Sequence, residues 1–177
     1  YFWFSPDPRM VLYAEDLKVA KSMRPLLNQK RFTVTFDTCF TEVITNCANT
    51  KRGPNNTSWI SSNFVKAYSE LHNQGIAHSV EVWCGSELVG GLYGVSLGAA
   101  FFGESMFSTV PNASKFGFIK LVQWLQKQAI NFIDCQVYTA HLASLGAVEI
   151  ERKVFLEELA ITQKAPSVLG KWIYSCD

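Results

Sequence analysis

Apolar and polar residues alternate along several short segments of this chain, and this alternation predicts strands. Over residues 31–36 it places the apolar residues on one side of an extended segment, as a half-buried strand requires. Two further apolar segments, 79–83 and 87–95, are separated by Gly85 and Ser86, a pair that favours a tight hairpin turn. We expect additional strands over residues 10–13, 99–107, 132–138 and 147–150.

Other segments repeat their apolar residues every three or four positions, which is the spacing of a helix with one buried side. The longest covers residues 113–129 and is expected to begin at Asn112 as its N-cap. A second helix begins after Ser61 or Ser62, runs to residue 73 and is closed by Gly75. We also expect helices over residues 22–29, with Ser22 as a possible N-cap, and over residues 39–48, 140–145 and 152–161.

The order of these elements favours an α+β fold. A meander of strands precedes a long helix, and another strand and helix follow it. This order resembles the Gcn5-related N-acyltransferase-like fold, a mixed and largely antiparallel sheet flanked by helices. Repeats and linkers are missing from the pattern, so we expect residues 1–177 to form a single domain. The aromatic residues Tyr1-Phe2-Trp3-Phe4 at the start indicate that an upstream segment is missing.

Composition excludes several classes of protein. The formal net charge is +1, so nucleic-acid binding would need a local basic patch rather than a global field. No apolar run reaches the roughly 18 residues of a membrane span, so we expect no membrane association. The five cysteines form no CxxC pair, and His72 and His78 have no metal-ligand spacing. We therefore expect reduced thiols, a cytoplasmic location and no metal.

The candidate chemistry is acidic and lies on apolar strands. Asp134 and Gln136 are two residues apart, so we expect both side chains on one face of their strand, and Glu104 lies within another apolar strand. Buried carboxylates need partners or a function. Cys135 alternates with this pair and should face the other way, which argues against a Cys-His or Ser-His nucleophile with His141.

Several motifs in one order make the chain similar to the leucyl/phenylalanyl-tRNA–protein transferase family. The similarity extends from Trp3 to about Ile150. The motifs are Ser5-Pro6-Asp7-Pro8-Arg9, Trp59-Ile60, His78-Ser79-Val80-Glu81-Val82-Trp83, Leu88-Val89-Gly90-Gly91-Leu92-Tyr93-Gly94-Val95, Gly103-Glu104-Ser105-Met106-Phe107-Ser108, Asn112-Ala113-Ser114-Lys115, Ile133-Asp134-Cys135-Gln136 and His141-Leu142-Ala143-Ser144-Leu145-Gly146-Ala147.

The resemblance implies a reaction and its substrates. The family transfers Leu or Phe from Leu-tRNA or Phe-tRNA to the α-amino group of proteins with N-terminal Arg or Lys, which creates an N-degron for proteolysis. The reaction is aminolysis of an activated ester, so the resemblance implies no cofactor, and aminoacyl-tRNA serves as a co-substrate. The enzyme must align the amine, move its proton and stabilise the oxyanion.

The resemblance also implies roles for individual residues. Asp134 and Gln136 match the catalytic pair, and Glu104 matches the residue that holds the donor α-amino group. The pocket for the aminoacyl side chain matches Leu92, Phe118, Leu121, Leu125 and Ile133. Trp59 matches the residue that stacks on the tRNA 3′-terminal adenosine, and Lys21, Arg24, Lys30 and Arg31 match a region that touches the tRNA backbone. Leu92 and Phe4 depart from the Met and Trp that are common at these positions.

Alternative interpretations remain open at this point. The first is an acyl-CoA-dependent N-acetyltransferase of similar fold, although its Gly-rich pyrophosphate turn is missing from residues 108–115. The second is a non-catalytic module that binds tRNA or peptides. Apolar residues at helical spacing are also commonly core, and surface cations are commonly only solvated. An acidic pocket is expected for the cation of the acceptor, and the candidates for it are Glu104 and Asp134, or Glu42 and Glu81.

Overall fold

A mixed sheet of seven strands runs through the computed structural model, which describes residues 4–29, 31–50 and 58–174. The strands are β1 (Arg9–Tyr13), β2 (Thr33–Phe36), β3 (Ala77–Cys84), β4 (Glu87–Leu97), β5 (Ala100–Ser108), β6 (Phe132–Gln136) and β7 (Val148–Ile150). They lie in the order β2-β3-β4-β5-β6-β1-β7. Neighbouring strands are antiparallel except β5 and β6, which are parallel. The predicted mixed, largely antiparallel sheet is confirmed.

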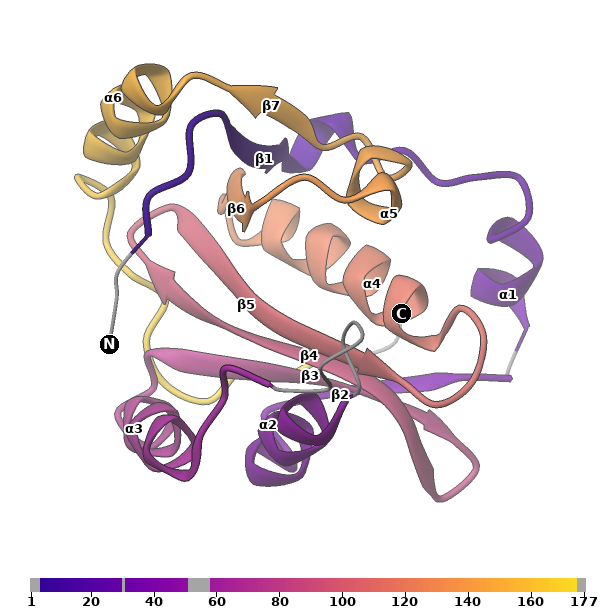
Figure 1. Cartoon of the computed structure of the whole chain (residues 1–177). Helices are drawn as coiled ribbons and strands as arrows, with labels where there is room; N and C mark the ends of the chain where they lie inside the picture. The colour runs from indigo at the N-terminus through magenta and orange to yellow at the C-terminus, as the bar shows by residue number, and fades with distance from the viewer. Residues whose placement is uncertain (1–3, 30, 51–57, 175–177) are drawn as a thin grey trace.

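Helices cover both faces of this sheet (Figure 1). They are η1 (Ala14–Asp16, 3-10), α1 (Arg24–Asn28), α2 (Phe40–Asn49), α3 (Ser62–Asn73), α4 (Ala113–Lys127), α5 (Ala140–Ala143) and α6 (Arg152–Thr162). Helix α4 packs on one face through the main apolar core, and α2 and α3 pack on the opposite face of β3, β4 and β5. Among the described residues, no helix combines the length and the apolar character that crossing a bilayer requires.

Local sequence signals predicted the turns better than the helix caps. Gly85 has a φ of 61° and joins β3 to β4 directly, so the predicted hairpin is confirmed. Asn112 occupies the predicted N-cap position of α4, but it adopts a φ of 71° and its side chain makes no capping hydrogen bond. Instead the backbone N–H of Ser114 donates to the Ser108 hydroxyl at 3.3 Å. Ser22 is not a cap, since α1 begins later, after Met23.

The N-terminal strand lies inside the sheet rather than at its edge. Strand β1 pairs with β6 on one side and with β7 on the other, although both strands come more than 100 positions later in the chain. Met10 and Leu12 of β1 face the main core, whereas Val11 faces α6. Residues at both ends of the chain are therefore brought to the same part of the sheet.

The segment that follows α6 returns to the opposite end of the sheet and completes the core. Trp172 is 2% exposed, and its backbone N–H donates to a carboxylate oxygen of Asp37 at 2.7 Å. Its ring stacks on His78, with the ring centroids 3.7 Å apart. The sequence pattern gave no sign of this contact, because the segment has no regular apolar spacing.

Candidate active site

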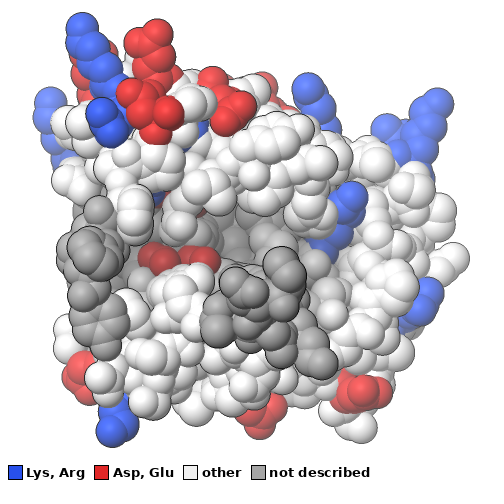
Figure 2. All heavy atoms as spheres, in the orientation of Figure 1, with Lys and Arg blue, Asp and Glu red and all other residues white. Residues whose placement is uncertain are grey.

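The two strands that carry the predicted acidic residues separate from each other within the sheet. Strands β5 and β6 pair only where residues 100–102 of β5 face residues 132–134 of β6. Beyond that point they diverge, which leaves a fork between them. Figure 2 shows that this face of the molecule is hollowed and that acidic side chains lie within the hollow. A fork of this kind exposes backbone groups and side chains that a continuous sheet would bury.

A β-bulge in β5 turns Glu104 toward the fork. In the pairing of β4 with β5, Tyr93 faces Ser105 and Gly94 faces Gly103, so Glu104 is the extra residue. Bulges of this type change the direction of a side chain and are frequent next to active sites. Gly94 is required opposite the bulge, because a Cβ there would lie 2.3 Å from the carbonyl oxygen of Phe102.

A second irregularity lies on β6, where the ladder with β1 skips Cys135 between Asp134 and Gln136. Asp134 is 0% exposed and forms a two-point ion pair with Arg9 of β1. The Arg9 guanidinium donates from Nε to Oδ1 at 2.9 Å and from Nη2 to Oδ2 at 2.6 Å. It also lies over the Phe155 ring, 4.8 Å from the ring centroid. This arrangement fixes the position of a fully buried carboxylate.

Gln136 follows the ion pair in a left-handed backbone conformation, with a φ of 67°. Its backbone N–H donates to Oδ1 of Asp134 at 2.9 Å, which holds the strained turn. Its side-chain Nε2 donates to the carbonyl oxygen of Gly103 at 2.9 Å, and its side chain also hydrogen-bonds to Glu104. The three predicted residues Glu104, Asp134 and Gln136 thus converge at one place, through a turn rather than through continued strand alternation.

Glu104 has an unusual protonation equilibrium. Burial raises the pKa of its carboxyl above the normal glutamate value, and the neighbouring Asp134 carboxylate raises it further. Hydrogen bonds from Tyr68 and Gln136 and the charge of Arg9 oppose this shift. Tyr68 comes from α3, and its position beside Glu104 is a finding of the structure.

Replacing Tyr68 with Phe is expected to raise the pKa of Glu104 further, because the hydroxyl hydrogen bond that favours the carboxylate is lost. Carbon-13 NMR of the labelled glutamate carboxyl groups, followed through a pH titration, measures this change. Tyr13→Phe is the matched control, since the Tyr13 hydroxyl donates to Glu158 at 2.8 Å and is not among the groups that act on Glu104. An unchanged Glu104 titration in Tyr68→Phe would show that the hydroxyl has no influence.

The predicted pocket residues come together in the main core beside α4. Each of them is at most 3% exposed, and the cluster is Leu92, Phe118, Leu121, Leu125 and Ile133. Ile133 lies on β6 directly before Asp134, on the α4 side of the sheet. Contact of these residues with an aminoacyl side chain stays a prediction.

The predicted tRNA contacts lie at the surface. Trp59 is 45% exposed and makes an edge contact with Phe64, with the ring centroids 5.3 Å apart. Lys21, Arg24 and Arg31 are exposed in and around α1, and the Arg31 guanidinium lies 5.3 Å from the centroid of the Phe32 ring. Lys30, as well as Trp3, lies outside the described residues.

Alternative nucleophiles do not have the required surroundings. Cys135 packs against the main core with Ile133, and burial together with the Asp134 charge raises the pKa of its thiol to about 12. The Ser144 hydroxyl donates to the backbone carbonyl of His141 at 2.6 Å rather than to the imidazole. Within residues 4–29, 31–50 and 58–174, no group of three or more His, Cys, Asp or Glu side chains is arranged to hold a metal ion.

Glu81 proves to be a structural residue. It is 0% exposed on β3, and its carboxylate accepts hydrogen bonds from the hydroxyls of Thr35, Thr38 and Ser79 at 2.6–2.7 Å. These bonds tie the segment before α2 to the sheet. With its oxygens occupied and shielded, Glu81 is not available to bind the cation of an acceptor.

Comparison with known proteins gives a consistent family. Residues 11–160 match the family described as Leucyl/phenylalanyl-tRNA protein transferase. A leucyl/phenylalanyl-tRNA–protein transferase from Christiangramia forsetii is 58% identical over 159 residues, which cover 89% of this chain and 75% of the relative. The relative of the same name from Flavobacterium johnsoniae is 55% identical over 157 residues, with 89% and 74% covered. One from Anaeromyxobacter sp. (strain K) is 47% identical over 170 residues, with 96% and 73% covered.

Solved structures show a more distant likeness. L-PGS from Bacillus licheniformis has a TM-score of 0.49 at 10% identity, over 77% of this chain and 47% of the other. An aminoglycoside acetyltransferase from an uncultured soil metagenomic sample has a TM-score of 0.49 at 11% identity, over 84% of this chain and 99% of the other.

Proposed function

Because the chain belongs to the leucyl/phenylalanyl-tRNA–protein transferase family, we propose a specific reaction for the residues at the fork. The family name gives the enzyme class, an aminoacyltransferase that moves an aminoacyl group from tRNA to a protein. The proposed donors are Leu-tRNA and Phe-tRNA. The proposed acceptors are cytoplasmic proteins with N-terminal Arg or Lys, and the transfer gives these proteins an N-degron. The convergence of Glu104, Gln136 and the Asp134–Arg9 pair supports this proposal.

Glu104 is proposed to bind the α-ammonium group of the aminoacyl moiety. Its carboxylate is partly buried at the bulge, and Tyr68 and Gln136 orient it by hydrogen bonds. A charge-assisted hydrogen bond in such a site is stronger than one in water and holds the ester carbonyl in a fixed position. The aminoacyl side chain then points through the fork toward the apolar cluster beside α4, where shape selects Leu and Phe over the β-branched residues Ile and Val.

Gln136 is proposed to orient the attacking amine. Its amide nitrogen has two hydrogens, one directed to the carbonyl of Gly103 and the other to Glu104. The amide oxygen remains as an acceptor for an N–H of the acceptor amine. As the amine attacks the ester carbonyl, the C–N bond forms, the C–O bond to the ribose breaks, and the amine proton ends on the ribose oxygen.

Asp134 acts on this step through Gln136. Its carboxylate contacts the Gln136 backbone N–H and the Arg9 guanidinium, and these three bonds hold Gln136 in its left-handed conformation. The proposed reaction draws its driving force from the tRNA ester, so no further group is required for the energetics. The acidic character of the hollow suits the cationic side chain of an N-terminal Arg or Lys.

Trp59→Ala is expected to weaken the binding of aminoacyl-tRNA, because an exposed indole at this position offers a stacking surface for the terminal adenosine. Base stacking on an aromatic side chain contributes about 1–3 kcal/mol, so we expect KM for Phe-tRNA to rise by roughly 5- to 150-fold with a smaller change in kcat. Steady-state transfer assays measure both constants. Trp124→Phe is unsuitable as a control, because Trp124 packs in the core. Tyr138→Ala serves instead, because Tyr138 is an exposed aromatic residue. Equal KM values for Trp59→Ala and wild type would contradict the stacking role.

The direct test of the proposed function is a transfer assay read by mass spectrometry. Leu-tRNA or Phe-tRNA is combined with peptides that begin with Arg, Lys or Ala. Extension of the Arg and Lys peptides alone supports both the reaction and the acceptor rule. Acetylation when acetyl-CoA replaces the tRNA, together with no extension from either charged tRNA, would overturn the proposal.

A further inference from the structure

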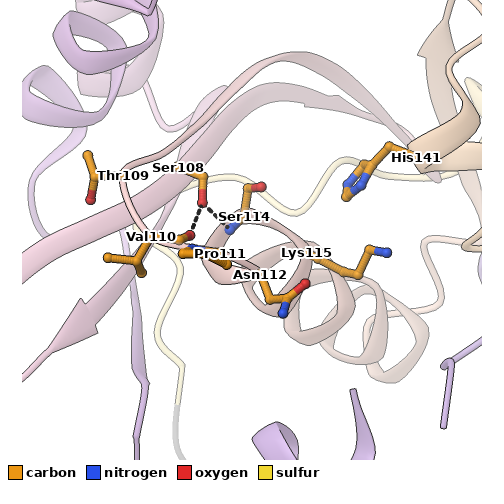
Figure 3. A pocket seen from close by; sticks show the side chains of 8 residues that line it. All are labelled: Ser108, Thr109, Val110, Pro111, Asn112, Ser114, Lys115 and His141. Atoms are coloured by element: carbon orange, nitrogen blue, oxygen red, sulfur yellow. Dashed lines mark hydrogen bonds between the residues drawn. The ribbon is translucent and has the colours of Figure 1, made fainter. Parts of the chain in front are cut away.

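An open cavity of about 360 Å³ lies beside the fork, where β5 ends and α4 begins (Figure 3). Its lining is polar and includes Ser108, Asn112, Ser114 and Lys115 from this junction and His141 from α5. None of the described residues that line it carries a carboxylate. None of these residues has a part in the reaction proposed above, so the cavity needs a separate explanation.

Two nitrogen-bearing side chains from different elements face this cavity. The Nε2 atom of His141 is buried and has no hydrogen-bond partner within the described part of the chain. Lys115 forms no ion pair with any acidic side chain of the described residues, and its charge lies near enough to His141 to lower the pKa of that imidazole, after burial as the larger cause. An unpaired ammonium group and an unpaired imidazole nitrogen beside a cavity favour an anionic ligand.

The backbone adds to this preference for an anion. The cavity adjoins the first turn of α4, a helix of 15 residues whose N-terminus carries a partial positive charge. Asn112 does not cap the helix, because its backbone is left-handed, and its side chain lines the cavity instead. The Ser114 N–H is held by the Ser108 hydroxyl. The Ser108 hydroxyl in turn donates to the carbonyl oxygen of Val110 at 2.7 Å, so the groups that face the cavity as donors are the Asn112 amide, the His141 imidazole and the Lys115 ammonium.

We propose that this cavity binds a phosphate group of the acceptor end of aminoacyl-tRNA, and this assignment rests on the proposed function. Ser108 is four residues beyond Glu104 on the same strand, which places the cavity about 13 Å from the residue that holds the donor amine. A strand whose terminal ester lies at Glu104 has its last phosphates within that distance. Figure 2 shows a basic side chain on the rim of the hollow, on the side of α4.

Lys115→Gln tests the assignment with two donors that differ in phosphate content. One is Phe-tRNA, and the other is 3′-O-phenylalanyl-adenosine, which has the ester and the base but no phosphate. We expect the substitution to raise KM for Phe-tRNA by about three- to tenfold and to reduce the salt dependence of that KM by roughly one phosphate contact. KM for phenylalanyl-adenosine should stay unchanged. Lys120→Gln is the matched control, since Lys120 is on the same helix with its ammonium group over the Phe116 ring.

A binding measurement separates this site from the reaction. Titration calorimetry with the trinucleotide CCA and with coenzyme A, on wild type and Lys115→Gln, requires no transfer. Weaker CCA binding in Lys115→Gln than in wild type supports the assignment of the cavity to tRNA. If wild type nevertheless transfers from neither donor, only the proposed function fails. Equal CCA binding by both proteins, or weakened binding of coenzyme A alone, overturns the assignment. An equal change in KM for Phe-tRNA and for 3′-O-phenylalanyl-adenosine also overturns the assignment.

Discussion

Replacing Asp134 with Asn is expected to lower kcat for transfer by about a hundredfold, because small displacements of catalytic groups have effects of this size. Asn keeps the shape of the side chain but removes the charge that two Arg9 nitrogens contact. The Arg9 side chain is 14% exposed and would then be left without its anion, so Gln136 loses the support that holds its left-handed backbone. Single-turnover kinetics with Phe-tRNA at saturating acceptor peptide measure the chemical step directly.

The effect on folding must be separated from the effect on catalysis. Removing one partner of a buried ion pair costs about 3–5 kcal/mol of unfolding free energy, and the partial exposure of Arg9 places this pair toward the lower end. Urea unfolding shows what fraction of Asp134→Asn is folded at the assay temperature. Asp7→Asn is the control, since its pair with Arg152 spans 3.8 Å at the surface and contributes little. Near-normal kcat in a folded Asp134→Asn protein would remove the pair from the mechanism.

Glu104→Gln is expected to lower kcat/KM by roughly a hundredfold, because truncating one partner of a partly buried charge pair costs about 2–5 kcal/mol. The neutral amide has the same size as the carboxylate but does not attract the ammonium group of the donor. Fluorescence binding of a non-hydrolysable phenylalanyl-tRNA analogue reports the loss in affinity, and the transfer assay reports the loss in rate. Glu157→Gln, at an exposed position of α6, is the matched control.

The pH dependence of the same reaction gives an independent test. The pKa of Glu104 is raised, so its carboxylate forms only above that raised value, and protonation removes the charge at a higher pH than in an ordinary glutamate. For wild type, kcat/KM should fall as the pH is lowered through this pKa. Glu104→Gln should lack that fall, because its side chain does not titrate. An identical acid limb in both proteins would assign the titration to another group and exclude Glu104 from donor binding.

The order of strands and helices is the part of the fold that the sequence predicts well. Alternation over β2 and the Gly85-Ser86 turn are local signals, and the apolar stripe of α4 is another, so each is visible within a short window. Caps were predicted less well, because a side chain such as that of Asn112 caps a helix only when its backbone is extended. The docking of Trp172 depends on a contact with Asp37 that is 135 positions away.

The candidate site also has residues that the sequence predicts and residues that it does not predict. Glu104, Asp134 and Gln136 are recognisable because polar residues are rare within apolar strands. The bulge that directs Glu104 cannot be recognised from composition, because the extra residue of a bulge can be of any residue type. Arg9 and Tyr68 were not predicted as partners, because each reaches the site through the packing of a distant element.

The insertion of β1 between β6 and β7 delays assembly of the site during chain synthesis. Arg9 is made early, but its partner Asp134 lies 125 positions later, and at ribosomal rates the wait is on the order of ten seconds. Until then the edge of β1 has no neighbour, and the fork does not exist. Recovery of transfer activity during refolding is therefore expected to follow the pairing of β1 with β6 rather than the collapse of the core.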